Sequence, residues 1–198
     1  MSGPVPQLIL ASSSPYRQQL LQRIGVPFTV VAPEIDESPR PAEEPAELVR
    51  RLASEKAMAV AATHPDQVVI GSDQLASLEG RVLGKPGSAD KAVEQLAACS
   101  GHSVEFLTGV CLLDGRRPGA EATLHMDITR VVFRGLRRDE IERYVAREMP
   151  IDCAGGFRSE GLGIALFERI DSQDPTGLVG LPLIWLSKAL IHLGFEVL

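Results

Sequence analysis

The sequence predicts an α/β fold, with several parallel strands and some antiparallel strands in one sheet. Short apolar runs that suit buried strands alternate with longer segments of helical periodicity. Few long gaps separate these segments, and the chain has neither an internal repeat nor a low-complexity linker. Its 198 residues suffice for one substantial domain or for two tightly joined lobes.

In the first half, three short apolar or β-branched runs predict strands at residues 8–11, 28–32 and 68–70. The last of these is expected to stop at the polar residues 71–73. Between the first two strands we expect a helix with Ser14 as its N-cap, Pro15 in its first turn and Gly25 at its end. Residues 46–62 form a second helix. Its expected core-facing residues are Leu48, Val49, Leu52 and Val60.

In the second half, a capped helix spans residues 88–99 and a strand spans residues 104–113. Residues 124–133 alternate as a strand does, with Met126, Ile128 and Val132 on one face. A charged surface helix follows at 138–147, then a strand at 163–168 and a closing helix at 183–193 that carries Trp185. This alternation completes the α/β pattern.

The composition excludes several classes of protein. Hydrophobic residues make up 44% of the chain and charged residues 23%, as in ordinary globular proteins. The net charge of −6 argues against a broad nucleic-acid surface, and no apolar run is long enough to span a bilayer. Residues 1–7 lack the features of a signal peptide, so we expect a cytoplasmic protein with neither a nucleic-acid nor a membrane partner. Three cysteines without paired metal spacing argue against a disulfide framework or a structural zinc.

The start of the first helix predicts an anion site. Serines 12–14 and Pro15 lead into the helix, and Arg17 lies one turn inside it. Unpaired backbone N–H groups at a helix N-terminus, together with hydroxyls and a guanidinium, suit a phosphate. An ordinary capped helix has the same features, so this pattern alone leaves both interpretations open.

Carboxylates occur at two further places. Glu34, Asp36 and Glu37 follow the second strand and could share a magnesium or manganese ion, although a solvated acidic loop has the same composition. Asp73 stands at the expected end of the third strand, where α/β sheets keep their crevice. It could hold a metal or take a proton from water, or it could simply cap the next turn.

Two lysines and a glycine-rich segment complete the candidates. Lys56 lies late in the second helix, and Lys85 is held between a glycine and a proline. Together with Arg17 they would match a triphosphate if the fold brings them together. In residues 153–163, Phe157 could stack on a base and Glu160 could accept hydrogen bonds from one, unless this segment is only a flexible connection.

Eight blocks of the chain resemble one known family. In order they are ASSSPYRQQLL, APEIDES, LASEKA, IGSDQ, GKP, SGHSVEFLTGV, CAGGFRSEGLG and LVGLPL. They are similar to the Maf family of nucleoside triphosphate pyrophosphatases over nearly the whole chain. The resemblance implies a single Maf/Ham1 (ITPase-like) domain over residues 5–198: an elongated mixed sheet flanked by helices, with two lobes around a cleft. It also implies hydrolysis between the α and β phosphates with a divalent metal such as Mg, Mn or Co, and a chain that could form a homodimer.

The resemblance assigns roles by position. Asp73 matches the proton acceptor, and the phosphate-binding residues are Ser12, Ser14, Arg17, Lys56 and Lys85. Glu37, with Asp36 as its neighbour and Asp73, matches the metal and water site.

Three positions distinguish branches of the family. An aromatic residue at Tyr16, with Gln74 and Glu160, resembles the branch that hydrolyses 7-methyl-GTP to 7-methyl-GMP and pyrophosphate. Because 7-methylguanine is a cationic ring, an aromatic face and a carboxylate suit it. The alternatives are a dTTP/UTP or broad-specificity house-cleaning pyrophosphatase, and a nucleotide-sensing protein without turnover.

Overall fold

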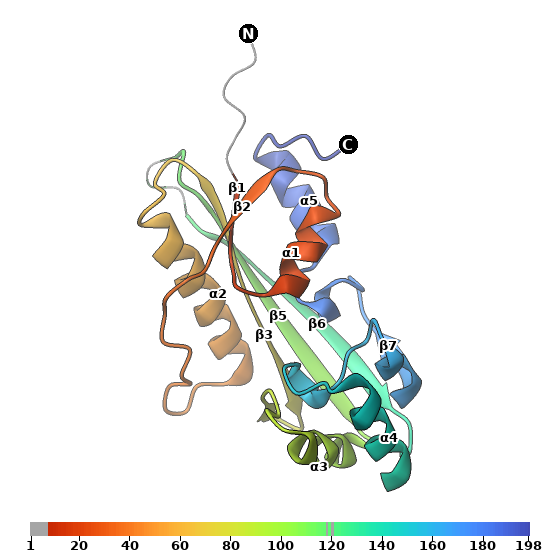
Figure 1. Ribbon diagram of the computed structural model, residues 1–198. Coiled ribbons are helices and arrows are strands. Elements are labelled where there is room, and N and C mark those ends of the chain that lie inside the picture. Colours follow the sequence, from red (N-terminus) through yellow and green to blue (C-terminus); the bar gives the residue numbers. More distant parts are fainter. Residues whose placement is uncertain (1–7, 118, 120) are drawn as a thin grey trace.

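The centre of the molecule is a seven-stranded mixed sheet in the order β2-β1-β3-β5-β6-β7, with β4 paired to β3 (Figure 1). The computed structural model describes residues 8–117, 119 and 121–198, so the expected domain start at residue 5 lies outside them. β1 pairs in parallel with β2 and β3, and every other strand pairing among the described residues is antiparallel. The strands are β1 (Leu8–Ala11), β2 (Phe28–Val31), β3 (Val68–Leu78), β4 (Arg81–Leu83), β5 (Ser103–Asp114), β6 (Thr123–Phe133) and β7 (Phe167–Asp171).

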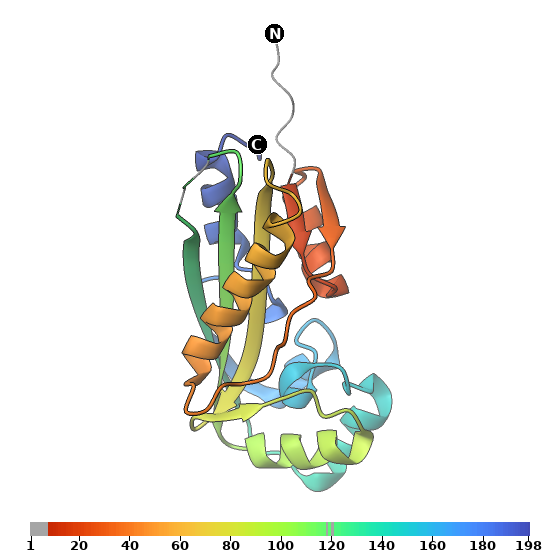
Figure 2. The ribbon, with the colours of Figure 1, turned by 90° about the vertical axis from the view of Figure 1, so that its left-hand side faces the viewer.

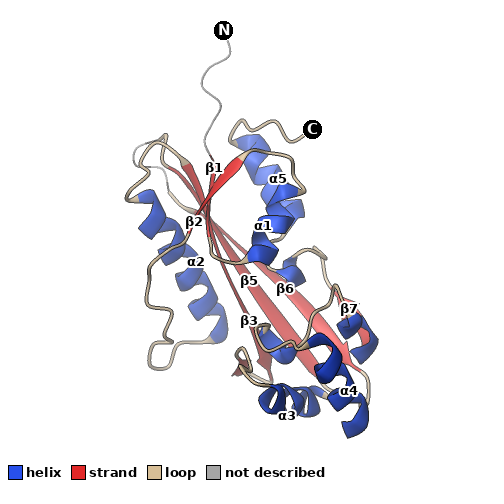
Figure 3. Ribbon diagram, in the orientation of Figure 1, coloured by secondary structure: helices blue, strands red, loops and turns tan. Residues whose placement is uncertain are grey.

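Helices cover both faces of this sheet and one of its ends. The α-helices are α1 (Pro15–Gln22), α2 (Pro45–Ala61), α3 (Ala89–Cys99), α4 (Arg138–Glu148) and α5 (Leu183–His192). Three short 3₁₀ turns are η1 (Ala154–Gly156), η2 (Leu162–Leu166) and η3 (Gly177–Val179). α2 runs along one face of the long strands (Figure 2), while α1 and α5 lie together on the other side. α3 and α4 lie at the far end of the long strands (Figure 3).

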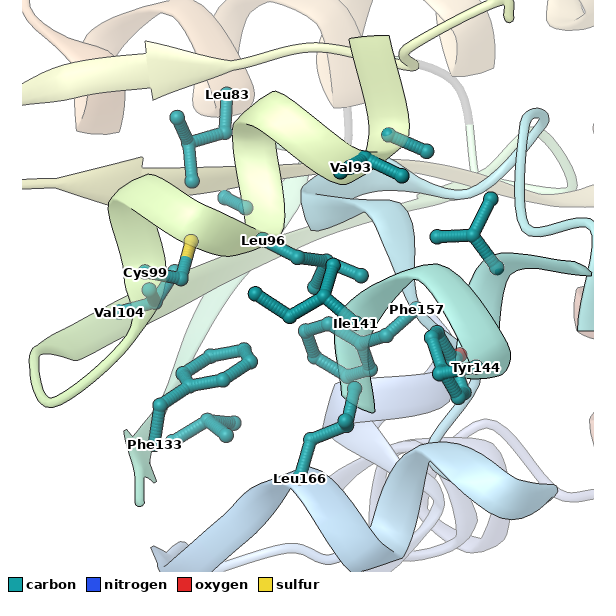
Figure 4. Packing of buried hydrophobic residues seen from close by; sticks show 14 of the residues in the cluster. Leu83, Val93, Leu96, Cys99, Val104, Phe133, Ile141, Tyr144, Phe157 and Leu166 are labelled. Atoms are coloured by element: carbon teal, nitrogen blue, oxygen red, sulfur yellow. The ribbon is translucent and has the colours of Figure 1, made fainter. Parts of the chain in front are cut away.

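Separate hydrophobic cores lie toward the two ends of the long strands. At one end, α1 and α5 bury residues such as Leu21 and Leu186 against β1 and β3. At the other end, α3 and α4 pack with Phe133, Phe157 and their neighbours (Figure 4). The long strands β3 and β5 contribute residues to both cores and so connect them.

Two expected strands differ from those in the structure. β3 does not stop after residue 70 but continues to Leu78, because residues 71–78 pair with β5 throughout. Tertiary pairing outweighs the weak strand preference of glycine, serine and aspartate here. Gly71 has a packing role instead, since a Cβ there would overlap the backbone of α2 at Ala53 and Ala57. The strand expected at 163–168 is mainly the 3₁₀ turn η2, and β7 begins only at Phe167.

The remaining predicted elements are confirmed within a few residues. The alternation on β6 is also confirmed, but Met126, Ile128 and Val132 lie on its less buried face. Ile128 is 52% exposed, whereas Val131 and Phe133 on the opposite face belong to the core. All three cysteines are free thiols, as expected. Within the described part of the chain, no helix combines the length and apolar character that crossing a bilayer requires.

Candidate active site

A cavity of about 350 Å³ opens beside the middle of β3. Segments from the start of α1, the loop after β2, α2, β3 and the loops near Lys85, η1 and η3 form its wall. Ten of the eleven residues that the resemblance assigns to the site lie in this wall. They are Ser12, Ser14, Tyr16, Arg17, Glu37, Lys56, Asp73, Gln74, Lys85 and Glu160. The fold therefore brings together residues that are up to 148 positions apart in the printed sequence.

The start of α1 is organised as the sequence predicts. Ser14 is the N-cap, and its hydroxyl accepts a hydrogen bond from the backbone N–H of Arg17 at 3.4 Å. The Ser12 hydroxyl accepts from the backbone N–H of Ser14 at 3.1 Å, which orders the turn before the helix. Both serines line the cavity, so the positive end of the helix dipole faces the space that a phosphate would occupy.

Arg17 places its guanidinium in the cavity wall. Its Nε donates to the backbone oxygen of Gly180 at 3.0 Å. Burial lowers the pKa of Arg17, while the negative charges of Asp73 and Glu37 act in the opposite direction. The guanidinium nevertheless stays protonated at neutral pH, because its ordinary pKa is above about 12. A poorly solvated cation of this kind favours binding of an anion.

Lys56, Asp73 and Glu37 form the charged centre of the cavity. The Lys56 Nζ lies 2.7 Å from Asp73 Oδ1 and 3.0 Å from Glu37 Oε1. The Lys56 side chain is only 7% exposed and that of Asp73 12%. Burial raises the pKa of Asp73, although the Lys56 charge and hydrogen bond, and then Arg17, lower it. A carboxylate with a raised pKa is a stronger base than a solvated one, so Asp73 is suited to accept a proton.

The loop that carries Glu37 is held to α2 by Arg51. Its Nη2 donates to the backbone oxygen of Ser38 at 3.1 Å, one residue beyond Glu37. The same guanidinium pairs with Glu43 at 2.6 Å and with Glu55 at 3.0 Å. The hydrogen bond from Arg51 lowers the pKa of Glu43 to about 2. Sequence patterns did not reveal this clamp, because only Arg51 and Glu55 have helical i,i+4 spacing, while the contacts with Glu43 and Ser38 join α2 to the loop before it and match no motif.

The structure does not bring Asp36 into the cavity, nor Glu34, the other acidic candidate of this loop. Asp36 Oδ1 accepts a hydrogen bond from the backbone N–H of Ser38 at 2.9 Å, and Asp36 is exposed. Neighbouring residues in this extended loop point in different directions, so Glu37 reaches Lys56 and Asp36 does not. The expected contribution of Asp36 to a metal site therefore has no support in this geometry.

Glu37 and Asp73 are the carboxylates that could hold a divalent metal here. No group of three or more histidine, cysteine or acidic side chains suited to a metal occurs in the described ranges. Magnesium is commonly held by one or two carboxylates, with substrate phosphates and water as its other ligands. The donor set thus fits a metal that arrives with a polyphosphate, and it does not fit a metal caged by protein ligands alone.

Another part of the wall contains Tyr16, Cys153 and Arg158. The Tyr16 hydroxyl lies 4.0 Å from Cys153 Sγ, and Arg158 Nη2 donates to Asp152 Oδ1 at 2.9 Å. Burial raises the pKa of both Tyr16 and Cys153, so both side chains are neutral at neutral pH. Tyr16 thus presents an uncharged aromatic side chain to the cavity.

Glu160 and Lys85, like Glu37, are exposed members of the wall. Glu160 accepts a hydrogen bond from the Ser159 hydroxyl at 2.8 Å. Lys85 lies in the loop after β4, and this loop is tied down where the N–H of Gly87 donates to the oxygen of Ile151 at 2.9 Å.

Phe157 differs from its expected role, while Gln74 makes contacts that the sequence did not indicate. The Phe157 ring makes edge-to-face contacts with Phe106, Phe133 and Phe167, so it belongs to the core and is not a free stacking surface. The Gln74 amide nitrogen donates to the Thr108 hydroxyl and to the backbone oxygens of residues 177 and 178. That nitrogen is therefore committed to the protein itself.

Comparison with known proteins identifies the family. The family model described as "Maf-like protein" matches residues 7–193. A relative from Nitrosococcus oceani is 50% identical over 98% of this chain and 96% of its own length. Relatives from Xanthomonas axonopodis pv. citri and Pseudomonas aeruginosa are 52% and 49% identical, each over 98% of this chain and 100% of their own. All three are named 7-methyl-GTP pyrophosphatase.

Solved structures with a similar chain path include the Ham1 protein of Staphylococcus aureus. It is 15% identical, with a TM-score of 0.48 over 94% of this chain and 98% of its own. The family assignment does not depend on this likeness, since the family model and the relatives each cover nearly the whole chain. The chain belongs to the Maf family.

Proposed function

We propose that this protein is a nucleoside triphosphate pyrophosphatase that hydrolyses 7-methyl-GTP to 7-methyl-GMP and pyrophosphate. The observation that carries the proposal is the direct contact of Lys56 with Asp73 in a cavity that Arg17 and Lys85 also line. Three cations around one buried carboxylate suit a polyphosphate and a base for water. The names of relatives with about 50% identity over the full chain support the substrate and the reaction.

In this mechanism the chain's own residues position the triphosphate and activate water. The phosphates lie against the N-terminus of α1 and are held by Arg17, Lys56 and Lys85. Asp73 orients a water molecule in line with the leaving pyrophosphate and takes its proton. Positioning of this kind, together with general-base help worth about 10²–10⁴ in rate, lowers the barrier.

We also propose that Glu37 and Asp73 hold a divalent cation, such as Mg, Mn or Co, together with the phosphates. When bound, such an ion neutralises charge on the bridging and leaving oxygens. The contacts of Glu37 and Asp73 with Lys56 support this proposal. They show that the two carboxylates lie around one positive charge, and a divalent cation can balance the same acidic pair.

For the base, we propose that Tyr16 and Glu160 provide the selectivity. A neutral aromatic ring attracts the cationic 7-methylguanine, and a carboxylate accepts from its N1–H and N2–H groups. A pyrimidine offers neither the positive ring nor this pair of donors. Nucleotides and free thiols both fit the cytoplasm, where we expect the protein to act. Dimer formation stays a prediction.

The test is a side-by-side turnover assay with 7-methyl-GTP, GTP, UTP and dTTP, with each metal and with a chelator. Product analysis must show pyrophosphate and the monophosphate, because orthophosphate with a diphosphate would place the cleavage elsewhere. Asp73→Asn should lose about 10²–10⁴ in turnover and keep its fold, as judged by circular dichroism. Binding of all the triphosphates without turnover would identify a nucleotide sensor, and faster turnover of UTP or dTTP would identify a pyrimidine enzyme.

A further inference from the structure

We propose that Ser72, Gln74 and Thr108 are positioning residues for Arg17 and act on it through the turn of residues 177–180. This inference rests on the proposed function, because it takes Arg17 to bind substrate phosphate. Neither Ser72 nor Thr108 lines the cavity, so direct contact with a nucleotide does not explain why polar residues stand at these buried positions. Both are nevertheless buried polar residues whose hydroxyls point at this one turn.

The first half of the turn is held by two side chains. The backbone oxygen of Gly177 accepts from Gln74 Nε2 at 2.8 Å and from Thr108 Oγ1 at 2.9 Å. Gln74 Nε2 also donates to the oxygen of Leu178 at 3.1 Å and to Thr108 Oγ1 at 2.8 Å. Because the amide faces two carbonyl oxygens, its nitrogen and not its oxygen must point at the turn. Gln74 and Thr108 are direct partners in the β3–β5 register, which explains why they meet.

The second half of the turn joins Ser72 to Arg17. The backbone oxygen of Gly180 accepts from Ser72 Oγ at 3.0 Å and from Arg17 Nε at 3.0 Å. With Nε engaged, the direction of the guanidinium plane is fixed. Its two terminal nitrogens have no hydrogen-bond partner within residues 8–117, 119 and 121–198. These nitrogens form the fork that can bind a phosphate in a bidentate manner.

The turn itself has little freedom to move. A Cβ on Gly177 would overlap the Asp127 carboxylate, and a Cβ on Gly180 would come within 3.3 Å of Arg17 Cγ and Nε. Just before the turn, Asp174 accepts from the N–H of Thr176 at 3.0 Å and from the N–H of Ile184 at 2.6 Å. A carbonyl fixed in this way can orient a long, otherwise mobile arginine side chain and reduce the entropy lost on binding.

The proposal predicts an interaction that a purely structural role would not produce. Removing the Ser72 hydroxyl or the Thr108 hydroxyl should weaken substrate binding only through its effect on Arg17. Each loss should therefore be large when Arg17 is present and nearly absent when Arg17 has been replaced. This is the condition that a double-mutant cycle measures.

The experiment uses Ser72→Ala and Thr108→Val, each alone and combined with Arg17→Gln. Thr108→Ser is the conservative variant that keeps the hydroxyl. Ser77→Ala is the control, because Ser77 is a buried serine of the same strand that lies outside the cavity wall. For every variant we would measure kcat/KM for 7-methyl-GTP, the Kd of the α,β-methylene analogue of GTP by calorimetry, and the midpoint of urea unfolding.

We expect Ser72→Ala and Thr108→Val each to lower kcat/KM and weaken analogue binding by about tenfold, as is typical of one network hydrogen bond. In the Arg17→Gln background the same substitutions should change either quantity by less than about twofold. Thr108→Ser should restore most of the loss, and Ser77→Ala should behave as the unmodified protein.

Equal losses of kcat/KM and analogue affinity with and without Arg17 would overturn the proposal. Losses that simply follow the decrease in the midpoint of urea unfolding would overturn it as well. Failure of the proposed function would look different. The unmodified protein would then release no pyrophosphate, while the cycle on analogue binding would still report whether Ser72 and Thr108 act through Arg17. A protein that neither hydrolyses 7-methyl-GTP nor binds the analogue would refute both statements.

Discussion

Replacing Lys56 with methionine should move the acidic limb of the pH–activity profile to higher pH. Lys56 lies 2.7 Å from Asp73 Oδ1, and its charge and hydrogen bond are the main influences that oppose the effect of burial on the Asp73 pKa. Methionine has a similar length and fills the same space without a charge. The substitution therefore removes the counter-charge of Asp73 while it leaves the packing of α2 against β3 largely intact.

The size of the shift follows from the contact. An opposite charge within about 4–6 Å typically moves a carboxyl pKa by about 1–3 units. The contact here is shorter than that, and both side chains are mostly buried. Arg17 still lowers the Asp73 pKa after the substitution, and Glu37 raises it. We therefore expect an upward shift of about 2 pH units.

The assay measures kcat/KM for 7-methyl-GTP between pH 5 and 9, a range of about 4 units that spans the expected shift. Because the same substrate is used throughout, its own titration cancels between variants. Lys91→Met is the control, since Lys91 is exposed on α3 and lies outside the cavity wall. An acidic limb that stays in place in Lys56→Met, with reduced activity at all pH values, would refute Asp73 as the group that titrates.

Stability provides a second check on the same reasoning. A carboxyl whose pKa is raised by folding binds its proton more tightly in the folded state than in the unfolded state. The free energy of unfolding must therefore fall as pH rises through the window between the two pKa values. In Lys56→Met this window should extend to higher pH than in the unmodified protein, and urea unfolding at several pH values would measure it.

Three further predictions concern other parts of the structure. Glu160→Gln should lower turnover of 7-methyl-GTP more than that of UTP, and equal losses would count against base recognition by Glu160. Gly71→Ala should cost about 3 kcal/mol or more of unfolding free energy in urea, because its Cβ would overlap α2, whereas Gly135→Ala, which meets open space, should be nearly neutral. Arg51 lowers the pKa of Glu43 to about 2, so the contribution of the Glu43–Arg51 pair to the free energy of unfolding should be complete above about pH 4.5. That contribution should be lost as pH falls toward 2. Glu43→Gln should flatten this acid dependence, and an unchanged pH–stability curve would exclude the pair as its source.

Much of the fold was predictable because local signals and tertiary packing agree. The N-cap at Ser14 and the apolar face of α2 act within a few residues, so the printed sequence contains them in full. The length of β3 was not predictable in this way. Gly71, Ser72, Asp73 and Gln74 interrupt its apolar run, and they continue the strand only because β5 offers a partner at every position.

The site residues also divide into those that the sequence identifies and those that only the tertiary structure reveals. Arg17, Lys56, Asp73 and Lys85 were recognisable from residue type and from the resemblance, and the structure brings them to one cavity. The residues that hold them in place were missed. Ser72 and Thr108 are ordinary polar residues in the sequence, and only the path of the chain after β7 gives their hydroxyls acceptors in one turn, the backbone oxygens of Gly180 and Gly177.

The alternation of β3 explains how one strand serves both purposes. Successive side chains of a strand point to opposite faces, so Gly71 and Asp73 face α2, where Asp73 meets Lys56. Ser72 and Gln74 face the other side, where they hold the turn that receives Arg17. A shift of one residue in the pairing of β3 would exchange these faces and separate the carboxylate from its lysine. Gly71, which lets α2 approach closely enough for that contact, therefore contributes to the chemistry as well as to the packing.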